Sequence, residues 1–507
     1  MVGAGVAGLR AAIELSSAGR VLVLNKKEIP AFKSPDWKSE ALWLSDEDDI
    51  SLHLQDTLTA GDGLCNPAAV KILLEQGAER IDELIHWDAH HGKKLVFELE
   101  NPHTKIRVLH SKGASTGREV LRILYEKAGS LKNVSIVPGV FVTELRTESG
   151  RVAGVAVLDE NGLPHEIACS AVLLTTGGMG QIYRNTTNPD AATADGIALA
   201  YRAGAEIGDM EFVQFYPTAL YMKKVPRFLV DERLRSEGAY LRNLELDRFM
   251  GKYHPLGERA PSDVISRAIV HEMEVSRAKD PFVYLDITHM NAAKIQKYFP
   301  RVYETCMSYN IDITEDLIPV RPAAHFGVGG VRTDVDGRTS VSGLYAAGEV
   351  AMSGAHGANR MPSNSLLESL VYGARAAKAM SSAERTSAGS ARQAEAAYSN
   401  GPVDAGIEES IGQIQDLMWN EVGVARIRTG MQKAVKALEE MGPKVAHPKT
   451  RRAHEAASLH TTALIVARSA LAREESRGAH YRVDYPDHDD KKFLKHSIVR
   501  TEKIVFV

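Results

Sequence analysis

The amino-acid sequence predicts an α/β protein in which a Rossmann-like dinucleotide-binding domain is interrupted by an α+β capping domain and followed by a C-terminal helical domain. Three observations predict this fold class. A glycine-rich turn occurs at 3–8, a second cofactor-type pattern occurs at 343–366, and apolar residues over 404–475 have a helical spacing. The intervening stretch shows neither glycine pattern. The expected limits are 1–218 with 326–385 for the dinucleotide-binding domain, 219–325 for the capping domain and 400–507 for the helical domain.

The first unit combines a strand, a glycine-rich turn, a helix and a second strand. Residues 3–8 match the pattern G-x-G-x-x-G, and an apolar-periodic helix and a buried strand over 21–24 follow. In such a unit the pyrophosphate of a dinucleotide lies over the helix N-terminus. Only Met1 and Val2 stand for the first strand. The second strand is followed by no acid that would hold a ribose, and Glu28 is the nearest. The candidate cofactor residues are Gly3, Gly5, Val6, Ala7, Gly8, Asn25 and Lys26.

Further cofactor-type patterns follow along the chain. A buried strand over 171–174 precedes a Gly-Gly pair, and a strand over 343–347 ends at an acid that can hold a ribitol or ribose hydroxyl. A helix is expected to begin at 363–365 with Ser or Asn as N-cap, and its free N–H groups suit an electron-rich ring edge. Each piece alone also fits a glycine-rich connection between packed elements, but the ordered series is more specific. The candidates here are Gly177, Gly178, Asp195, Gly348, Glu349, Asn364, Ser365 and Leu366.

Two residues beside these patterns suit a carboxylate. His325 and Arg360 are hydrogen-bond donors, and arginine can hold a carboxylate with two parallel bonds. The combination therefore indicates a flavin site next to a carboxylate site.

The bulk composition excludes several other classes. The formal net charge of −4 over 507 residues provides no basic field for nucleic acid. We see no apolar run long enough to span a bilayer and no signal peptide. The three cysteines form no metal-spaced cluster, so no metal site is expected, and their low number fits a reducing cytoplasm.

Four segments together resemble the fumarate reductase/succinate dehydrogenase flavoprotein family. They are residues 116–119, 208–215, 356–368 and the tail at 475–486, and the resemblance covers nearly the whole chain. The tail favours the branch that oxidises L-aspartate over the respiratory members. The resemblance implies FAD, held noncovalently because no attachment histidine stands near Ser34.

The activity that the resemblance implies is hydride transfer from the Cα of L-aspartate to flavin N5. The product would be iminoaspartate, and O2 or fumarate would accept the electrons. This reaction begins the route through quinolinate to NAD. It implies a small dicarboxylate or amino-acid substrate, a cytoplasmic location and quinolinate synthase as a candidate partner.

The resemblance also assigns substrate residues. Glu100 would face the substrate amine, while His325 and Arg360 would hold carboxylate oxygens. Three other family positions differ in this chain: Tyr216 replaces a histidine, Asp231 replaces a threonine or serine, and Ser262 replaces the arginine used as acid/base and carboxylate clamp. A serine cannot replace a guanidinium.

Two departures fall near the flavin. Residues 36–39 read Asp-Trp-Lys-Ser where the family has Ala-Gln-Gly-Gly, and Ala114 replaces an aspartate. Because the substitutions gather at the chemistry, three hypotheses stay open. The chain is an L-aspartate-oxidising enzyme, a catalytically impaired or non-catalytic relative that keeps the fold, or a flavoenzyme that acts on another amino or dicarboxylic acid, such as a fumarate-reductase-like enzyme. The arginines that could supply the missing charge are Arg233, Arg235, Arg259 and Arg267.

Overall fold

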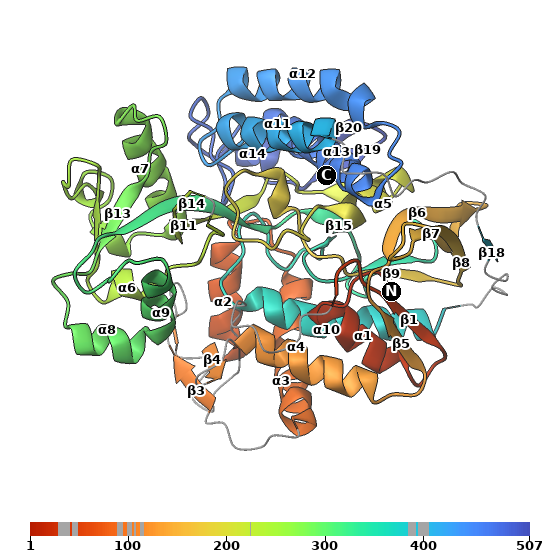
Figure 1. The fold of residues 1–507 in the computed structure, drawn as a ribbon. Helices are drawn as coiled ribbons and strands as arrows, with labels where there is room; N and C mark the ends of the chain where they lie inside the picture. Colours follow the sequence, from red (N-terminus) through yellow and green to blue (C-terminus); the bar gives the residue numbers. More distant parts are fainter. Residues whose placement is uncertain are drawn as a thin grey trace.

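A computed structural model shows how these segments are arranged (Figure 1). It describes residues 1–28, 41–42, 49–88, 95–98, 104–105, 108–111, 116–223, 225–383, 392–393 and 405–507. Glu100, Ala114, Ser34 and residues 36–39 lie outside the described residues, so the predictions made for them are untested.

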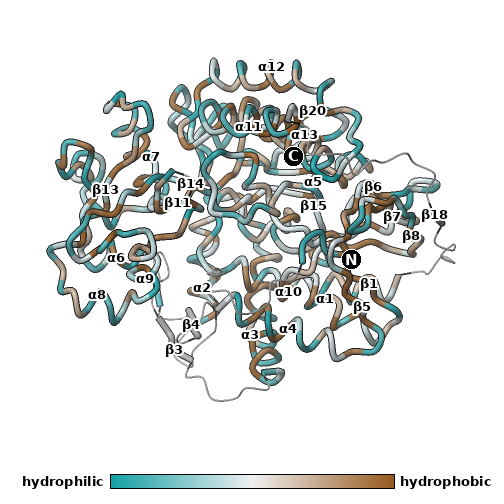
Figure 2. The backbone as a smooth tube through the Cα atoms, viewed as in Figure 1, coloured by the Kyte–Doolittle hydropathy of each residue, from teal (hydrophilic) through white to brown (hydrophobic). Residues whose placement is uncertain are grey.

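Parallel strands from distant parts of the chain form the nucleotide-binding sheet. Strand β1 (Val21–Leu24) pairs in parallel with β5 (Val134–Val137), and β9 (Val172–Leu174) pairs in parallel with β16 (Leu344–Ala346). Val2 forms parallel bridges to both Leu24 and Leu174, so it joins the two pairs. The hydrophobic residues of β1 and β5 lie beside helix α1 (Figure 2). Buried parallel strands of this kind carry ligands at their carboxyl ends.

Helices pack against this sheet through small residues. Helix α1 (Val6–Leu15) lies against α10 (Asn364–Ser381), which brings segments more than 340 residues apart together (Figure 1). A Cβ atom on Gly373 would lie 2.7 Å from the Ala7 carbonyl oxygen, so a side chain there would separate the two helices. Three more helices complete this layer: α2 (Ile50–Ala60), α3 (Pro67–Trp87) and α4 (Thr116–Gly129).

An antiparallel sheet projects from the same unit. It has the strand order β18-β8-β7-β6, and two tight turns connect its three longer strands. The strands are β6 (Phe141–Glu148), β7 (Arg151–Leu158), β8 (Pro164–Ala168) and β18 (Arg392–Gln393).

The middle of the chain forms a separate hydrophobic core, drawn in green at the left of Figure 1. Its buried residues all fall between Leu220 and Val320. Strands β11 (Val213–Leu220) and β14 (Ile318–Gly327) are antiparallel neighbours that carry the chain into this unit and back. The remaining elements are β12 (Tyr240–Arg242), β13 (Val283–Asp286), α6 (Arg233–Ser236), α7 (Ser262–Val275), α8 (Ala292–Tyr298) and α9 (Pro300–Ser308).

The C-terminal part is helical up to residue 472 and then returns to the first unit. Helices α11 (Ala405–Glu421), α12 (Arg428–Val445) and α13 (Arg451–Ala472) lie at the top of Figure 1. The chain then ends in a hairpin of β19 (Ser497–Arg500) and β20 (Lys503–Phe506). This hairpin extends a five-stranded sheet in the order β17-β15-β10-β19-β20, a strand contribution that the helical pattern did not predict. The other three strands are β10 (Ile207–Gly208), β15 (Gly330–Arg332) and β17 (Ala351–Met352).

The predicted fold class is confirmed: parallel strands, an inserted α+β unit and a C-terminal helical unit are all present. Within the part of the chain that the structure describes, no helix is both long and apolar enough to cross a membrane.

Candidate active site

One large cavity, of about 2130 Å³, runs from the N-terminal glycine turn to the capping unit. The ends of β9 and β16, the start of α10, strands β11 and β14, helices α6 and α7, and residues 478–481 all contribute to its lining. Most of the residues predicted from the sequence line this cavity. Gly8 and Asn364 do not.

The glycine turn combines close packing with an open face. A Cβ atom on Gly3, whose φ is +110°, would lie 2.3 Å from the Thr175 carbonyl oxygen, and one on Gly8 would lie 2.1 Å from the Gly3 carbonyl oxygen. Gly5 meets nothing within 4 Å and faces the cavity. Gly5 is also the N-cap of α1 and forms no side-chain cap, so the first N–H groups of the helix are available to an anion.

The side chains of Asn25 and Lys26, which follow strand β1, fix the end of this strand. Asn25 Oδ1 accepts a hydrogen bond from the Ala4 N–H (3.2 Å), which holds the glycine turn. Lys26 Nζ forms ion pairs with Asp195 (2.7 Å) at the start of α5 (Asp195–Arg202) and with Glu455 (3.1 Å) of α13. Asp195 is buried, and its Oδ1 atom has no hydrogen-bond partner among the described residues. A nucleotide hydroxyl would satisfy this acceptor, so the site fits FAD here.

The opposite edge is formed by the two other glycine patterns. Gly177 has φ +76° and open space beside it, so the cavity wall there is main chain. The Glu349 carboxyl packs on Gly178 and accepts a hydrogen bond from the Gly327 N–H (3.1 Å). Burial raises the pKa of Glu349 to about 7, although the Gly327 bond and the charge of Arg360 oppose this shift.

Helix α10 begins at Ser363, which is the predicted N-cap in position but forms no side-chain cap. Asn364 points away from the cavity and into the core. Its Nδ2 donates to Thr57 Oγ1 (3.1 Å), and its Oδ1 contacts His53 Nε2 (3.1 Å). Its side chain therefore fixes α10 against α2, while Ser365 and Leu366 line the cavity.

The predicted carboxylate site is assembled at the other end of the cavity. Arg360, which is 7% exposed, donates from Nε to Gln214 Oε1 (3.1 Å) and from a terminal nitrogen to Ser365 Oγ (3.2 Å). Its guanidinium also lies over the Phe326 ring, 4.8 Å from the centroid. Arg360 is itself part of the cavity lining.

His325 lies in the same wall, where Thr187 Oγ1 is 2.8 Å from its Nδ1. Burial, together with the charge of Arg360, lowers the pKa of His325 to about 3. The imidazole is therefore neutral at physiological pH and can contribute a hydrogen bond but no charge. Arg360 alone supplies the charge of this pair.

Tyr216 and Asp231 have partners that the sequence did not reveal. The Tyr216 hydroxyl donates to the Val230 carbonyl oxygen (2.5 Å), so its proton is directed at the main chain and not at a ligand. Asp231 is bound by Arg233, whose Nε and terminal nitrogen approach its two oxygens at 3.2 and 2.8 Å. The like charge expected at Asp231 is thus balanced by its neighbour.

The surroundings of Ser262 distinguish between the four candidate arginines. Ser262 Oγ donates to Glu232 (3.2 Å) and accepts from a terminal nitrogen of Arg235 (3.3 Å). Arg235 is 5% exposed, and its Nε has no partner among the described residues. Arg233 is paired with Asp231, Arg267 is paired with Asp263 (2.7 Å), and Arg259 is exposed. Arg235 is therefore the guanidinium that stands beside Ser262.

Sequence reasoning missed Gln214 and Thr187. Gln214 and Tyr216 are two residues apart on β11 and alternate with buried neighbours, so the strand period offered a signal for Gln214. The Gln214 amide also donates to the Arg360 carbonyl oxygen (3.1 Å) and thereby holds both the side chain and the main chain of Arg360. Nothing in the local sequence marks Thr187.

Comparison with known proteins gives matches over the whole chain. The family model for an FAD binding domain matches residues 1–366, and the model for the fumarate reductase flavoprotein C-terminal region matches residues 412–505. The chain is 38% identical to an L-aspartate oxidase of Streptomyces coelicolor over 99% of this chain and 90% of that protein. It is also 38% identical to an L-aspartate oxidase of Pseudomonas aeruginosa, over 96% of this chain and 95% of that protein.

Solved structures give the same relationship. The FrdA subunit of E. coli quinol fumarate reductase superposes with a TM-score of 0.88 at 28% identity, over 100% of this chain and 95% of that chain. Mycobacterium smegmatis Sdh1 superposes with a TM-score of 0.86 at 30% identity, over 100% of this chain and 93% of that chain.

Proposed function

The chain belongs to the fumarate reductase/succinate dehydrogenase flavoprotein family, and we propose that it catalyses the FAD-dependent oxidation of L-aspartate to iminoaspartate. O2 or fumarate accepts the electrons, and the product leads through quinolinate to NAD. Two observations support this activity: the full-length similarity to L-aspartate oxidases and the two buried guanidinium groups, of Arg235 and Arg360, in the lining of one cavity. The second observation carries the proposal, because a dicarboxylate needs two cationic contacts.

The cofactor end of the cavity fits FAD. The α1 N-terminus and Gly5 would hold the pyrophosphate, Asp195 would accept from a nucleotide hydroxyl, and the 348–366 region would face the ring system. When bound, FAD supplies the hydride acceptor at N5. We propose that the cofactor is held noncovalently.

The residues of this chain bind and orient the substrate. Arg360 and neutral His325 would hold one carboxylate, with Gln214 and Ser365 fixing the guanidinium. Arg235 would approach the second carboxylate, because it lines the cavity and one of its terminal nitrogens lies beside Ser262. The short Ser262 side chain leaves room there. Glu100 would face the substrate amine, as the family resemblance implies.

A second candidate is a relative that binds a dicarboxylate but turns it over slowly or not at all. Ser262 favours this candidate, because a serine provides no guanidinium at that position. The neighbouring Arg235 already forms an ion pair with Glu232 at 3.5 Å. A fumarate-reductase-like reaction is a third possibility. We further propose a cytoplasmic location and a contact with quinolinate synthase.

Hydrogen peroxide release under air tests the proposed activity. FAD-loaded protein should release peroxide with L-aspartate and much less with L-asparagine, which has the same length but lacks the second carboxylate. Equal release with both substrates would show that the cavity does not recognise the second carboxylate. No release with L-aspartate, from protein that retains flavin, would favour the second candidate.

A further inference from the structure

We infer that the C-terminal segment 473–490, named here the strap, positions Arg360, with Arg477 as the positioning residue. The inference rests on the proposed function, because it assigns Arg360 to substrate binding. The strap contains three arginines, Arg473, Arg477 and Arg482, and all three are buried almost completely. None of the three is among the residues that line the cavity, so the inferred role is indirect.

The first attachment of the strap is to the strand that carries Gln214. Arg473 and Glu211 are both fully buried and are joined by a 2.6 Å ion pair. Glu211 precedes β11 by two residues, and its carbonyl oxygen also accepts from Arg426 (2.6 Å). Three residues further along, Gln214 binds Arg360. Since replacing a buried ion pair by apolar residues is often neutral or stabilising, this pair is better explained by fixing a geometry.

The second attachment is to the loop that carries Arg360 itself. The Ala479 N–H donates to the Ala358 carbonyl oxygen (3.0 Å), two residues before Arg360, and the Ala358 N–H donates to the Gly61 carbonyl oxygen (2.9 Å). The loop is thus held between the strap and the turn at 61–63. The approach is close, because a Cβ atom on Gly478 would lie 2.4 Å from the Ala358 carbonyl oxygen.

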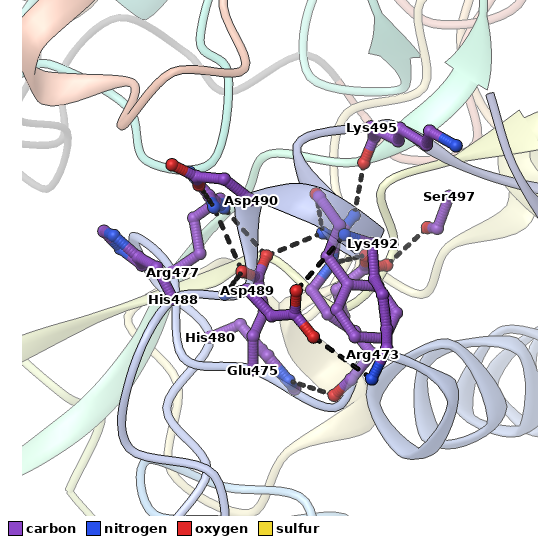
Figure 3. A network of polar contacts seen from close by, with 12 residues as sticks. Arg473, Glu475, Arg477, His480, His488, Asp489, Asp490, Lys492, Lys495 and Ser497 are labelled. Carbon is purple, nitrogen blue, oxygen red and sulfur yellow. Dashed lines mark hydrogen bonds and ion pairs between the residues drawn. The ribbon is translucent and has the colours of Figure 1, made fainter.

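Arg477 connects these two attachments. Its Nε and one terminal nitrogen bind the Glu475 carboxylate at 2.7 and 3.0 Å, and Glu475 also receives Arg473 (3.0 Å), as Figure 3 shows. The other terminal nitrogen donates to the Asp62 carbonyl oxygen (2.9 Å). Asp62 in turn accepts the Gly478 N–H at 2.8 Å. One guanidinium therefore ties the buried ion-pair chain to the turn that supports the Arg360 loop.

The strap also contains a matched control residue. Arg482 is fully buried and forms two 2.8 Å bonds to Asp484, and its remaining bonds go to carbonyl oxygens of Ala470, Leu471 and Arg473. All of these partners lie between residues 470 and 484. Losing Arg482 should therefore destabilise the strap without releasing the Arg360 loop or β11.

The experiment compares Arg477→Gln with Arg482→Gln in FAD-loaded full-length protein. Hydrogen exchange should increase in peptides covering 356–362 for Arg477→Gln, and only in strap peptides for Arg482→Gln. Succinate, a dicarboxylate without the amino group, should bind Arg477→Gln at least about tenfold more weakly than wild type, because small misplacements of a binding group are costly. Arg482→Gln should retain the wild-type Kd, and Arg477→Lys should recover part of the affinity.

The possible outcomes separate the two proposals. Equal exchange at 356–362 and equal succinate affinity in both glutamine variants would overturn the strap inference. If wild-type protein binds no succinate, the dicarboxylate site fails, while the exchange comparison still decides whether Arg477 holds the loop. Should Arg477→Gln not fold, Arg477→Lys is compared with Arg482→Lys, with the same order of effects and a smaller expected loss of succinate affinity.

Discussion

The two ends of the carboxylate region hold their charges in different ways. At one end, Arg360 is bound by the neutral side chains of Gln214 and Ser365. At the capping end, Asp231 binds Arg233, and Glu232 lies 3.5 Å from Arg235. A carboxylate beside a guanidinium offsets part of its attraction for an anion, and this applies to both Arg233 and Arg235. We therefore expect the Arg360 end to dominate substrate binding.

The largest effect should come from Arg360→Ala. The variant loses the guanidinium beside the neutral His325 imidazole, so we expect L-aspartate-dependent flavin reduction to fall by about 10³-fold or more. The spectrum of bound FAD should stay unchanged, because Arg360 lies at the substrate end. Stopped-flow absorbance measures both quantities. A reduction rate within threefold of wild type, which corresponds to about 0.6 kcal/mol in activation free energy, would exclude Arg360 from the site.

A smaller effect is expected at the capping end, and it separates two adjacent arginines. Arg235→Gln should lower kcat/KM for L-aspartate by about 10- to 100-fold, because it removes a buried donor beside Ser262. Arg233→Gln should have a milder effect, since Arg233 mainly neutralises Asp231. Steady-state peroxide assays compare the variants. If Arg233→Gln were the more damaging substitution, the assignment of the second carboxylate contact would pass to Arg233.

The capping end can also be altered toward the family pattern. Ser262→Arg combined with Tyr216→His and Asp231→Thr should raise turnover of L-aspartate above that of wild type, because it adds a guanidinium and removes a carboxylate. Ser262→Arg alone should raise turnover less. Arg235 now donates to Ser262 Oγ, so the new guanidinium would lie beside a second positive charge. Peroxide release by single and triple variants tests this order. Rapid turnover by the wild-type protein would show that Arg235 already meets the requirement.

The smallest effect concerns stability and pH at Glu349. Burial raises the pKa of its carboxyl to about 7, above the ordinary value of 4.5, so the folded protein holds this proton more tightly than the unfolded chain. Stability from this group is therefore lost as pH rises from about 4.5 through 7. Glu349→Gln should remove that loss. The free energy of unfolding that the variant gains over wild type, both free of FAD, should be larger at pH 8 than at pH 5 by on the order of 2 kcal/mol. Thermal unfolding at both pH values checks the difference, and a pH-independent gain would contradict it.

The sequence predicted the elements with strong local signals and missed those set by distant contacts. The glycine turn, the strands that precede Gly177 and Gly348 and the helix start at Ser363 all have a local pattern that sterics demand. Their assembly into one cavity agrees with the resemblance. The partners of Tyr216 and Ser262 depend on backbone positions that no local pattern encodes, and the strand hairpin after residue 497 is stabilised by pairing with β10. The role of the side chain at Asn364 was missed for the same reason, because His53 and Thr57 lie on another helix.

Anaerobic addition of L-aspartate to FAD-loaded protein tests the central claim most directly. Oxidation of the substrate must reduce the bound flavin, so the visible flavin absorbance should bleach with L-aspartate and return when air is admitted. Arg360→Ala should keep its colour under the same conditions. Wild-type protein that retains its colour with L-aspartate, yet bleaches with dithionite, would show that a reducible flavin is present without L-aspartate oxidation.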